Sequence, residues 1–386
     1  MKICFICNEY PPAPHGGVGI YVKTLSERLA KKGYKPIVIG MYPKTWHPLI
    51  SEENGVRIFR LPMTEAGGHR AGFFVNRLKL AQRVYHLSKK EKLEIVEAPE
   101  GGGWSMFFKH TCPNIIRLHN LAPYFSWQEG RSRGRLTVLA ETIAFRKATK
   151  ISAVSKFIAK ETLKLYPYAR LKTKGIKVIY NGIDTDLFVK APYQERDMGR
   201  IMFAGTIKAV KGIKTLFKAF DIVGRESPDY LLYLYGKDTY IAGGSYLMKT
   251  LDSTLQDGNV KERIRYVGPV PGNELPSAYA KASVCVFPSF AESFGLVAAE
   301  AMSCARPVIY SNATAGPELI EDKKTGHLCN PADYRQLADI ILHTLRNPSD
   351  AEAIGLAAAE RIRNFFSLER CIEENLKYYE EAHSVG

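Results

Sequence analysis

The chain has 386 residues, of which 46% are hydrophobic and 24% are charged, which is typical of a soluble globular protein and excludes a disordered one. A chain of this length is expected to form two domains of ordinary size. No apolar run approaches the ~18 residues that a membrane-spanning helix needs. The opening MKICFICNEYPP also lacks a secretory signal pattern, so we expect a cytoplasmic protein.

The seven cysteines form an odd and dispersed set, which indicates reduced thiols in a cytoplasmic compartment. Cys4 and Cys7 make a C-x-x-C pair, but they fall in an apolar run that is predicted to be a buried first strand. No second pair or histidine partner accompanies them, so we favour core thiols over a metal or redox site.

The net charge of +15 is unevenly distributed along the chain. Residues 1–180 hold 31 Lys and Arg against 12 Asp and Glu, whereas residues 181–386 hold 23 against 27. The basic clusters are Lys31, Lys32 and Lys35; Arg131, Arg133 and Arg135; and Lys172, Lys174 and Lys177. A basic first half favours an anionic partner such as a lipid surface, a phosphorylated acceptor or nucleic acid. A solvated, lysine-rich surface explains it equally well.

Short apolar runs of β-type residues alternate with longer amphipathic stretches, which predicts an α/β protein with parallel sheets. In the first half the predicted strands are residues 2–8, 36–41, 56–61, 94–97, 114–119 and 150–154. In the second half they are residues 200–205, 230–236, 263–267, 283–287 and 307–311. Each half begins with its own strand and glycine-bearing loop, so we expect two doubly wound, Rossmann-like domains.

The turn-forming stretch Asn181-Gly182-Ile183-Asp184 follows a predicted strand, KVIY, and predicts a domain boundary there. The expected domains are residues 1–180 and 181–365. Residues 366–386 then include an amphipathic final helix, predicted over 368–381.

The first predicted strand is followed by a glycine-rich loop that contains Gly16, Gly17 and Gly19, and a helix is predicted over residues 20–32. These glycines would allow positive φ and close backbone approach to a ligand. The loop is neither a G-x-G-x-x-G fingerprint nor a phosphate loop ending in G-K-[ST], so the sequence does not support nicotinamide or ATP use. A tight turn without a ligand is the alternative interpretation.

The segment after the strand at 283–287 is the most informative part of the chain. A turn through Pro288 precedes a helix that is predicted to begin near Phe294, and in an open parallel sheet this turn lies at the carboxyl edge, where ligands bind. The amides and dipole of the first helical turn suit a diphosphate. Glu292 before the helix and Glu300 inside it could bracket an elongated ligand such as a nucleotide-sugar. Two surface glutamates on an amphipathic helix are the alternative.

This segment, ESFGLVAAEAMSCARPVIYSN, resembles the paired-glutamate signature of the retaining glycosyltransferases of family four. The resemblance implies the GT-B fold, in which two Rossmann-like domains face each other across a cleft. It implies that Glu292 holds donor-sugar hydroxyls and Glu300 the ribose. Backbone amides near Phe294, Gly295 and Leu296 would then face the phosphates.

The resemblance extends over most of the chain and implies a role for each domain. Residues 1–180 would form the acceptor-side domain and residues 181–365 the nucleotide-sugar-binding domain. The final helix would cross back to pack on the first domain. Members of the family need no metal or other cofactor, and the D-x-D motif Asp184-Thr185-Asp186 falls in the predicted linker, away from the proposed diphosphate loops.

A second stretch, FAGTIKAVKG from Phe203 to Gly212, matches the family in part. The family usually has Gly-Arg where this chain has Gly205 and Thr206, followed by a Lys-Gly pair that Lys211 matches. The resemblance therefore implies that Lys211 stabilises the departing diphosphate, where negative charge develops in the transition state. With the arginine missing, Lys208 or the Thr206 hydroxyl would have to substitute for it in part.

His119 ends the strand IIRLH, and the resemblance implies that it holds the donor sugar; a lone histidine is otherwise more often structural. Gly16, Gly17 and Gly19 would face the donor diphosphate and the acceptor. Backbone groups near Val267 would meet the nucleobase, although nothing there distinguishes one base from another.

The expected activity is transfer of a hexose from a nucleoside diphosphate sugar to the hydroxyl of an unknown acceptor. The candidate acceptor segments are residues 42–70 and 124–135, the second of which mixes aromatics with arginines. That segment could contact an anionic membrane, stack against a sugar, or simply pack under a loop. A nucleic-acid-binding protein is the second hypothesis, although no clear reading module is present. A nucleotide-sugar epimerase or glycosyl phosphorylase on the same fold is the third.

Overall fold

The computed structural model describes residues 1–13, 16–46, 48–64, 68–109, 111–119, 134–166, 175–192, 195–242 and 244–384. The chain divides into two compact units. The first comprises the described residues of 1–119, 134–181 and 369–384, and the second those of 182–368. Within the described ranges, every helix is too short or too polar to span a lipid bilayer.

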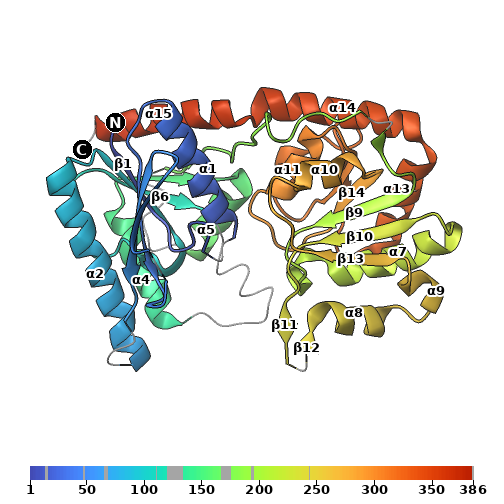
Figure 1. The fold of residues 1–386 in the computed structure, drawn as a ribbon, viewed down its shortest axis with the longest axis horizontal. Coiled ribbons are helices and arrows are strands. Elements are labelled where there is room, and N and C mark those ends of the chain that lie inside the picture. Colours follow the sequence, from blue (N-terminus) through green and yellow to red (C-terminus); the bar gives the residue numbers. More distant parts are fainter. Residues whose placement is uncertain are drawn as a thin grey trace. The chain divides into compact units, whose positions relative to one another are not determined.

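The first unit is built on a sheet with the strand order β3-β4-β2-β1-β5-β6-β7-β8. Strands β1 and β6 of this sheet are labelled in Figure 1. The strands are β1 Ile3–Ile6, β2 Ile37–Tyr42, β3 Ile50–Glu53, β4 Val56–Pro62, β5 Ile95–Pro99, β6 Asn114–Leu118, β7 Lys150–Ala153 and β8 Lys177–Val178. All neighbours pair in parallel except β3 and β4, which form an antiparallel hairpin. The helices are α1 Gly17–Lys31, α2 Gly68–Glu91, η1 Gly101–Gly103, α4 Arg135–Lys147, α5 Lys156–Leu165 and α15 Leu368–His383.

The second unit holds a parallel sheet with the order β13-β10-β9-β14-β15-β16. Its strands are β9 Arg200–Ala204, β10 Leu231–Tyr235, β13 Ile264–Gly268, β14 Val284–Phe287, β15 Val308–Ser311 and β16 His327–Cys329. A small ribbon pairs β11 Tyr240–Ile241 with β12 Gly244–Ser245. The helices are η4 Ala209–Lys211, α7 Ile213–Glu226, α8 Tyr246–Thr254, α9 Gly258–Lys261, α10 Leu275–Ala280, α11 Leu296–Ser303, α12 Gly316–Leu319, α13 Tyr334–Arg346 and α14 Pro348–Phe365.

The central strands of both sheets are near-continuous apolar runs, because a parallel sheet that is covered on both faces buries both sides of its central strands. All residues of β1, β2, β9 and β14 are buried. Cys4 and Cys7 belong to this core, and burial raises the pKa of Cys7 to about 12. The C-x-x-C pair therefore consists of core thiols, and all seven cysteines are free.

The eleven predicted strands are confirmed with bounds shifted by at most two residues. The prediction missed β3, β16 and the ribbon of β11 and β12, which are short, whereas the strand predicted at KVIY corresponds to β8. The expected acceptor segment at 42–70 contains the β3–β4 hairpin, of which only the second strand was predicted. The first helix begins at Gly17, three residues earlier than predicted, and α11 begins at Leu296, two residues later.

The last helix belongs to the first unit although it follows the second in sequence. On α15, Ile372 and Tyr379 are fully buried, and the hydroxyl of Tyr378 donates a hydrogen bond of 2.8 Å to the carbonyl of Ile151 on β7. Just before α15, Ile183 pairs with the chain at Phe366 and Leu368 through two backbone hydrogen bonds of 2.8 Å. The two chain segments that connect the units are therefore joined side by side.

Candidate functional site

The second sheet reverses its strand order between β9 and β14, which is the topological switch point of a doubly wound fold. Two loops leave the carboxyl ends of these strands, one over residues 205–212 and the other over 288–295. In open α/β sheets ligands bind in the crevice outside the strand ends at this point. The loops therefore mark the candidate site of this unit.

The two loops are fastened together by their backbones. The N–H of Phe290 donates a hydrogen bond of 2.8 Å to the carbonyl of Val210. Gly212 has a φ of +73°, and a Cβ there would overlap the carbonyl oxygen of Pro288. A glycine is required at this position, because any larger residue would push the loops apart.

Lys211 and Glu292 meet where these loops touch. The Lys211 Nζ forms an ion pair with the Glu292 carboxylate, and the N–H of Ser293 donates a 3.2 Å hydrogen bond to the same carboxylate. The two side chains are 18% and 16% exposed, so the pair is sheltered but reachable from solvent. A ligand can thus contact a cation and a carboxylate at one point, with phosphate oxygens on the first and hydroxyls on the second.

Helix α11 begins directly after the loop that carries Glu292. Gly295 has a φ of +94°, and a Cβ there would overlap the hydroxyl of Tyr310, which donates a hydrogen bond of 3.2 Å to the carbonyl of Phe294. Because Gly295 has no side chain to cap the helix, the amides of the first turn at Leu296 face no capping group of their own. This end of the helix suits an anion.

Glu300 lies inside α11, where burial raises the pKa of its carboxyl to about 7. The hydroxyl of Tyr279 on α10 donates a 3.2 Å hydrogen bond to this carboxylate, which opposes part of that rise. Glu292 and Glu300 therefore hold separate positions along one loop and helix, as the spacing predicted.

The other predicted residues of this unit lie along the same carboxyl edge. Gly205 follows β9, and its N–H donates a 2.9 Å hydrogen bond to Tyr235; the next residue, Thr206, is exposed. Val267 is 45% exposed and lies near the end of β13, the outermost strand, two strands from β9. Of the predicted residues in this unit, Val267 is therefore on the strand farthest from the Lys211–Glu292 ion pair.

In the first unit the switch point falls between β1 and β5, where the order of strands reverses. Glu9 follows β1, and its Oε1 accepts hydrogen bonds from the N–H groups of Gly16, at 3.2 Å, and Gly19, at 2.8 Å. The expectation of positive φ at Gly16, Gly17 and Gly19 was wrong. Gly16 has a φ of −115°, and the other two lie in the first turn of α1, which a distant carboxylate caps.

His119 follows β6 and is buried. Its N–H donates a hydrogen bond of 3.0 Å to the Glu100 carboxylate, and its ring lies 4.7 Å from the ring of Tyr21 in an edge-on arrangement. Burial, together with the positive charge of Arg117, holds the pKa of His119 well below its usual range. The imidazole is therefore neutral near pH 7.

The structure thus groups the predicted residues by unit. Lys211, Glu292, Phe294, Gly295, Leu296 and Glu300, with Gly205 and Thr206, lie at the carboxyl edge of the second sheet, whereas His119 and the glycines of 16–19 lie in the first unit.

Sequence reasoning missed the tyrosines that support the site. Tyr279, Tyr310 and Tyr21 each contact a predicted residue, but their neighbours are far apart in sequence, so spacing gave no signal. Glu9 was also missed, because its carboxylate caps the start of α1 from 7 and 10 positions away, outside the usual spacing of a helix cap. The arginine-rich part of the second acceptor segment and the cluster of Lys172 and Lys174 lie outside the described residues.

Asp184, in the D-x-D motif, has a local structural role. Its carboxylate accepts hydrogen bonds from the N–H groups of Asp186, at 3.2 Å, and Leu187, at 3.3 Å, in a tight turn. Within the part of the chain that the structure describes, no group of three or more metal-ligating side chains is gathered in one place.

Comparison with known families agrees with this geometry. Residues 15–187 match the model of Glycosyltransferase Family 4, and residues 199–347 match that of Glycosyl transferases group 1. Together the matches cover most of both units. The chain belongs to the family-four glycosyltransferases and has the GT-B fold, so the predicted family, fold and enzyme class are confirmed.

Individual relatives span the same architecture. The O-antigen chain mannosyltransferase B of Escherichia coli is 29% identical over 289 residues, covering 72% of this chain and 73% of the relative. The sucrose-phosphate synthase of Thermosynechococcus elongatus superposes with a TM-score of 0.84 at 23% identity over 100% of both chains. Anabaena HepE, solved in complex with UDP-glucose, gives a TM-score of 0.75 at 17% identity over 99% of this chain and 100% of that one.

Proposed function

We propose that the protein is a retaining, metal-independent glycosyltransferase that moves a hexose from a nucleoside diphosphate sugar to an acceptor hydroxyl. The observation that carries the proposal is the Lys211–Glu292 ion pair at the β9/β14 switch point, with the start of α11 beside it and Glu300 farther along the helix. A nucleotide-sugar has a sugar, a diphosphate and a ribose in that order, and these groups could contact the three parts in the same order.

Each residue then has a chemical role. Glu292 accepts hydrogen bonds from donor-sugar hydroxyls, and Glu300 accepts them from the ribose. Lys211 and the amides of Gly295 and Leu296 stabilise the negative charge that grows on the leaving diphosphate. Gly205, Thr206 and the backbone near Val267 complete the donor side. His119 holds the sugar from the first unit, and Gly16, Gly17 and Gly19 face the donor diphosphate and the acceptor. The expected cleft stays a prediction.

The transfer step needs no protein side chain as a base. The acceptor oxygen forms a bond to the anomeric carbon while the bond from that carbon to the diphosphate oxygen breaks. The bonding electron pair stays on the diphosphate, and the same diphosphate oxygen takes the proton of the acceptor hydroxyl. Lys211 favours this step because its charge is already in place before the leaving group forms.

Relatives support the class of donor. HepE was solved in complex with UDP-glucose, and the Escherichia coli relative is an O-antigen chain mannosyltransferase. We infer a role in polysaccharide, glycolipid or glycoconjugate synthesis. A thermal-shift screen with UDP, GDP, ADP and their glucose and mannose derivatives tests the donor site, since a ligand at 100 times its Kd stabilises by about 2.7 kcal/mol. If every compound leaves the melting temperature unchanged, the proposal fails.

The same reagents separate the alternatives. An epimerase converts the nucleotide-sugar without an acceptor, and a glycosyl phosphorylase needs orthophosphate in place of a nucleotide-sugar. A transferase releases the nucleoside diphosphate as the sugar reaches an acceptor or water. Salt-steep binding to RNA or DNA in a gel shift would instead favour the nucleic-acid hypothesis.

We also propose that the first unit binds an anionic membrane surface from the cytoplasmic side. Helix α2 exposes Phe74, Val75 and Leu78, which are 37%, 38% and 47% exposed, near one face of the helix. Lys79, Lys89 and Lys90 are also exposed on α2, whose single acidic residue, Glu91, is its last. Apolar side chains among lysines suit the boundary between headgroups and acyl chains.

A further inference from the structure

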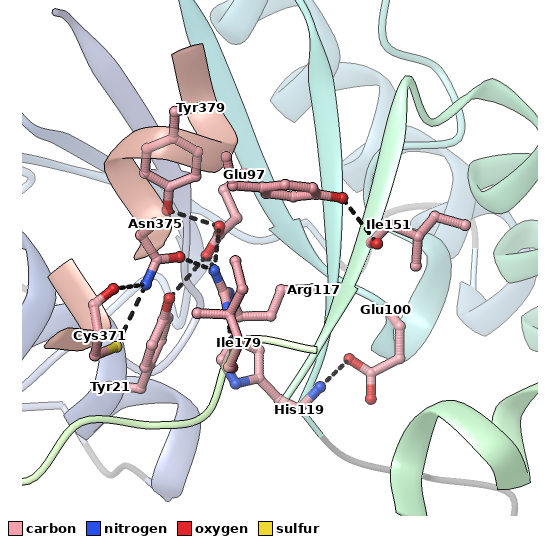
Figure 2. A network of polar contacts seen from close by, with 11 residues as sticks. Tyr21, Glu97, Glu100, Arg117, His119, Ile151, Ile179, Cys371, Asn375 and Tyr379 are labelled. Atoms are coloured by element: carbon pink, nitrogen blue, oxygen red, sulfur yellow. Dashed lines mark hydrogen bonds and ion pairs between the residues drawn. The ribbon is translucent and has the colours of Figure 1, made fainter. Parts of the chain in front are cut away.

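A buried polar cluster lies next to His119 in the first unit (Figure 2). Its centre is the ion pair of Arg117 on β6 with Glu97 on β5; these residues are 0% and 3% exposed. The guanidinium donates two hydrogen bonds to the carboxylate, from Nε to Oε1 at 2.9 Å and from Nη2 to Oε2 at 3.2 Å. This two-pronged geometry fixes the Arg117 side chain in one orientation.

Three further side chains complete the cluster. Tyr379 on α15 donates a hydrogen bond of 2.8 Å to Glu97, and Tyr21 on α1 donates a longer one of 3.5 Å. The amide oxygen of Asn375, also on α15, accepts a hydrogen bond from Arg117. A satisfied buried ion pair often adds little stability compared with apolar side chains of the same size. The stability of the Arg117–Glu97 ion pair therefore says little about its role, whereas its position next to His119 suggests one.

The cluster contacts His119 through Tyr21. The Arg117 guanidinium carbon lies 5.0 Å from the centre of the Tyr21 ring, and that ring contacts the His119 ring edge-on. Arg117 and His119 are two residues apart along one strand and its end, so their side chains leave the same side of the sheet. Tyr21 also sits in the second turn of α1, directly after the glycines.

We propose that Arg117, Glu97 and Tyr21 are positioning residues that hold the His119 ring in one orientation for contact with the donor sugar. The inference rests on the proposed function, in which His119 holds that sugar. Arg117 also opposes protonation of the ring, in keeping with the low pKa of His119. A neutral imidazole can both donate and accept hydrogen bonds to sugar hydroxyls, whereas imidazolium only donates.

Other titratable groups around the ring are already engaged. Glu97 is bound to Arg117, and Tyr379 to Glu97. Glu100 accepts the backbone N–H of His119, and the Cys371 sulfur on α15 accepts a hydrogen bond of 3.3 Å from Asn375. Arg117 is therefore the charge that dominates at the imidazole, and removing it is the decisive change.

Helix α15 offers a matched pair of variants. Tyr378 and Tyr379 are adjacent, both buried, and each donates a hydrogen bond of 2.8 Å, the first to the Ile151 carbonyl and the second to Glu97. Tyr379→Phe loosens the cluster, whereas Tyr378→Phe removes a comparable bond outside it. If both variants lose the same thermal stability but only Tyr379→Phe affects His119, the effect is due to positioning and not to general destabilisation.

The first experiment follows the imidazole signal of His119 by NMR in histidine-labelled full-length protein, assigned by its loss in His119→Ala. In the wild type we expect no titration from ~pH 5.5 to ~pH 8.5, since burial and Arg117 both disfavour the cation. In Glu97→Gln combined with Arg117→Gln, the signal should titrate at a higher pH than in the wild type, because burial still lowers the pKa of His119 but the positive charge is gone. In Tyr21→Leu the signal should shift or broaden. Tyr379→Phe should shift it more than Tyr378→Phe. An unmoved signal in every folded variant overturns the inference.

A double-mutant cycle with UDP-glucose and with GDP-mannose as donors gives the functional test. Tyr21→Leu should lower kcat/KM by about 10-fold, within the ~100-fold that a 1 Å misplacement can cost, and should add almost nothing in a His119→Ala background. Full additivity contradicts the positioning role. If His119→Ala leaves kcat/KM unchanged while the NMR signal responds as expected, the proposed contact of His119 with the sugar is wrong. The positioning of the His119 ring by Arg117, Glu97 and Tyr21 would still hold.

Discussion

The hydroxyl of Tyr279 donates a hydrogen bond of 3.2 Å to the carboxylate of Glu300. The two residues lie on successive helices, α10 and α11, of the second unit. Burial raises the pKa of this carboxyl to about 7, so near neutral pH a large share of the unliganded protein carries a protonated Glu300. A proposed ribose ligand would donate to the same oxygens and favour the charged form.

The stability of the unliganded protein should therefore depend on Glu300 in a defined direction. Between pH 4.5 and about 7 the unfolded chain loses this proton while the folded chain keeps it, so this group lowers stability as pH rises and has no further effect above about 7. Urea unfolding should show Glu300→Gln gaining stability relative to the wild type across that window. A constant difference from pH 5 to 8 would rule out this role.

Nucleotide binding should have the opposite dependence on pH. Ribose hydroxyls bind the carboxylate form of Glu300, so binding of UDP or GDP should tighten as pH rises through 7 and should release protons. Calorimetry in two buffers of different ionisation enthalpy measures that release. Glu300→Gln serves as the control for titration of the phosphates, and an unchanged proton count in this variant would exclude Glu300 as the source.

Lys211 and Glu292 should each be essential to turnover. Lys211→Ala removes the cation that stabilises the leaving diphosphate, and Glu292→Gln removes the carboxylate that accepts sugar hydroxyls. We expect each to lower donor hydrolysis by about 100-fold, the scale of losing one preorganised electrostatic contact. Glu226→Gln, which breaks the exposed pair of Glu226 with Arg346 in the same unit, should leave activity intact. Near-normal turnover in both site variants would contradict the assignment.

Gly295→Ala tests the loop that carries the proposed phosphate amides. The variant must place a Cβ at a φ of +94° and against the Tyr310 hydroxyl, at a cost of roughly 1–3 kcal/mol. We expect a lower melting temperature and weaker binding of UDP or GDP. Adding Tyr310→Phe should recover part of the loss because it removes the overlapping hydroxyl. Gly258→Ala at the start of α9, where a Cβ meets nothing within 4 Å, should change neither measurement.

The membrane proposal predicts a specific dependence on α2. The wild type should co-sediment with phosphatidylglycerol-containing vesicles in low salt and should be released as salt increases. Phe74→Ser combined with Leu78→Ser should lower the bound fraction several-fold without unfolding the protein, because both side chains are exposed. Met248→Ser, which replaces an exposed side chain of the second unit, is the control. Equal binding by all three proteins would remove α2 from the interface.

The sequence was sufficient where the physical signal is local. The buried strands of both sheets are apolar runs bounded by turn residues, so their places along the chain were predictable. The positions of Glu292 and Glu300 relative to one another were predictable because a strand, a turn and a helix fix them, whereas their proposed roles came from the family resemblance. By contrast, β3 reads Ile-Ser-Glu-Glu, an exposed edge strand without an apolar alternation.

Contacts between distant parts of the chain were not predictable from one sequence. The Lys211–Glu292 pair joins residues 81 positions apart, and nothing in either local motif specifies it. The start of α1 was misplaced because the apolar spacing begins at Ile20, whereas the cap is the carboxylate of Glu9, upstream in the chain. The neutral state of His119 likewise depends on Arg117 and on burial, which only the fold reveals.

The order in which the ribosome makes this chain matters for Arg117 and Glu97. Their partners Asn375 and Tyr379 lie 258 and 282 positions downstream of the residues that they contact. Until α15 has left the exit tunnel, a nascent first unit holds a charged pair that lacks two of its hydrogen-bond partners. That unit therefore completes its interior only after α15, Leu368–His383, has been translated, and the second unit is free to fold before the first is finished.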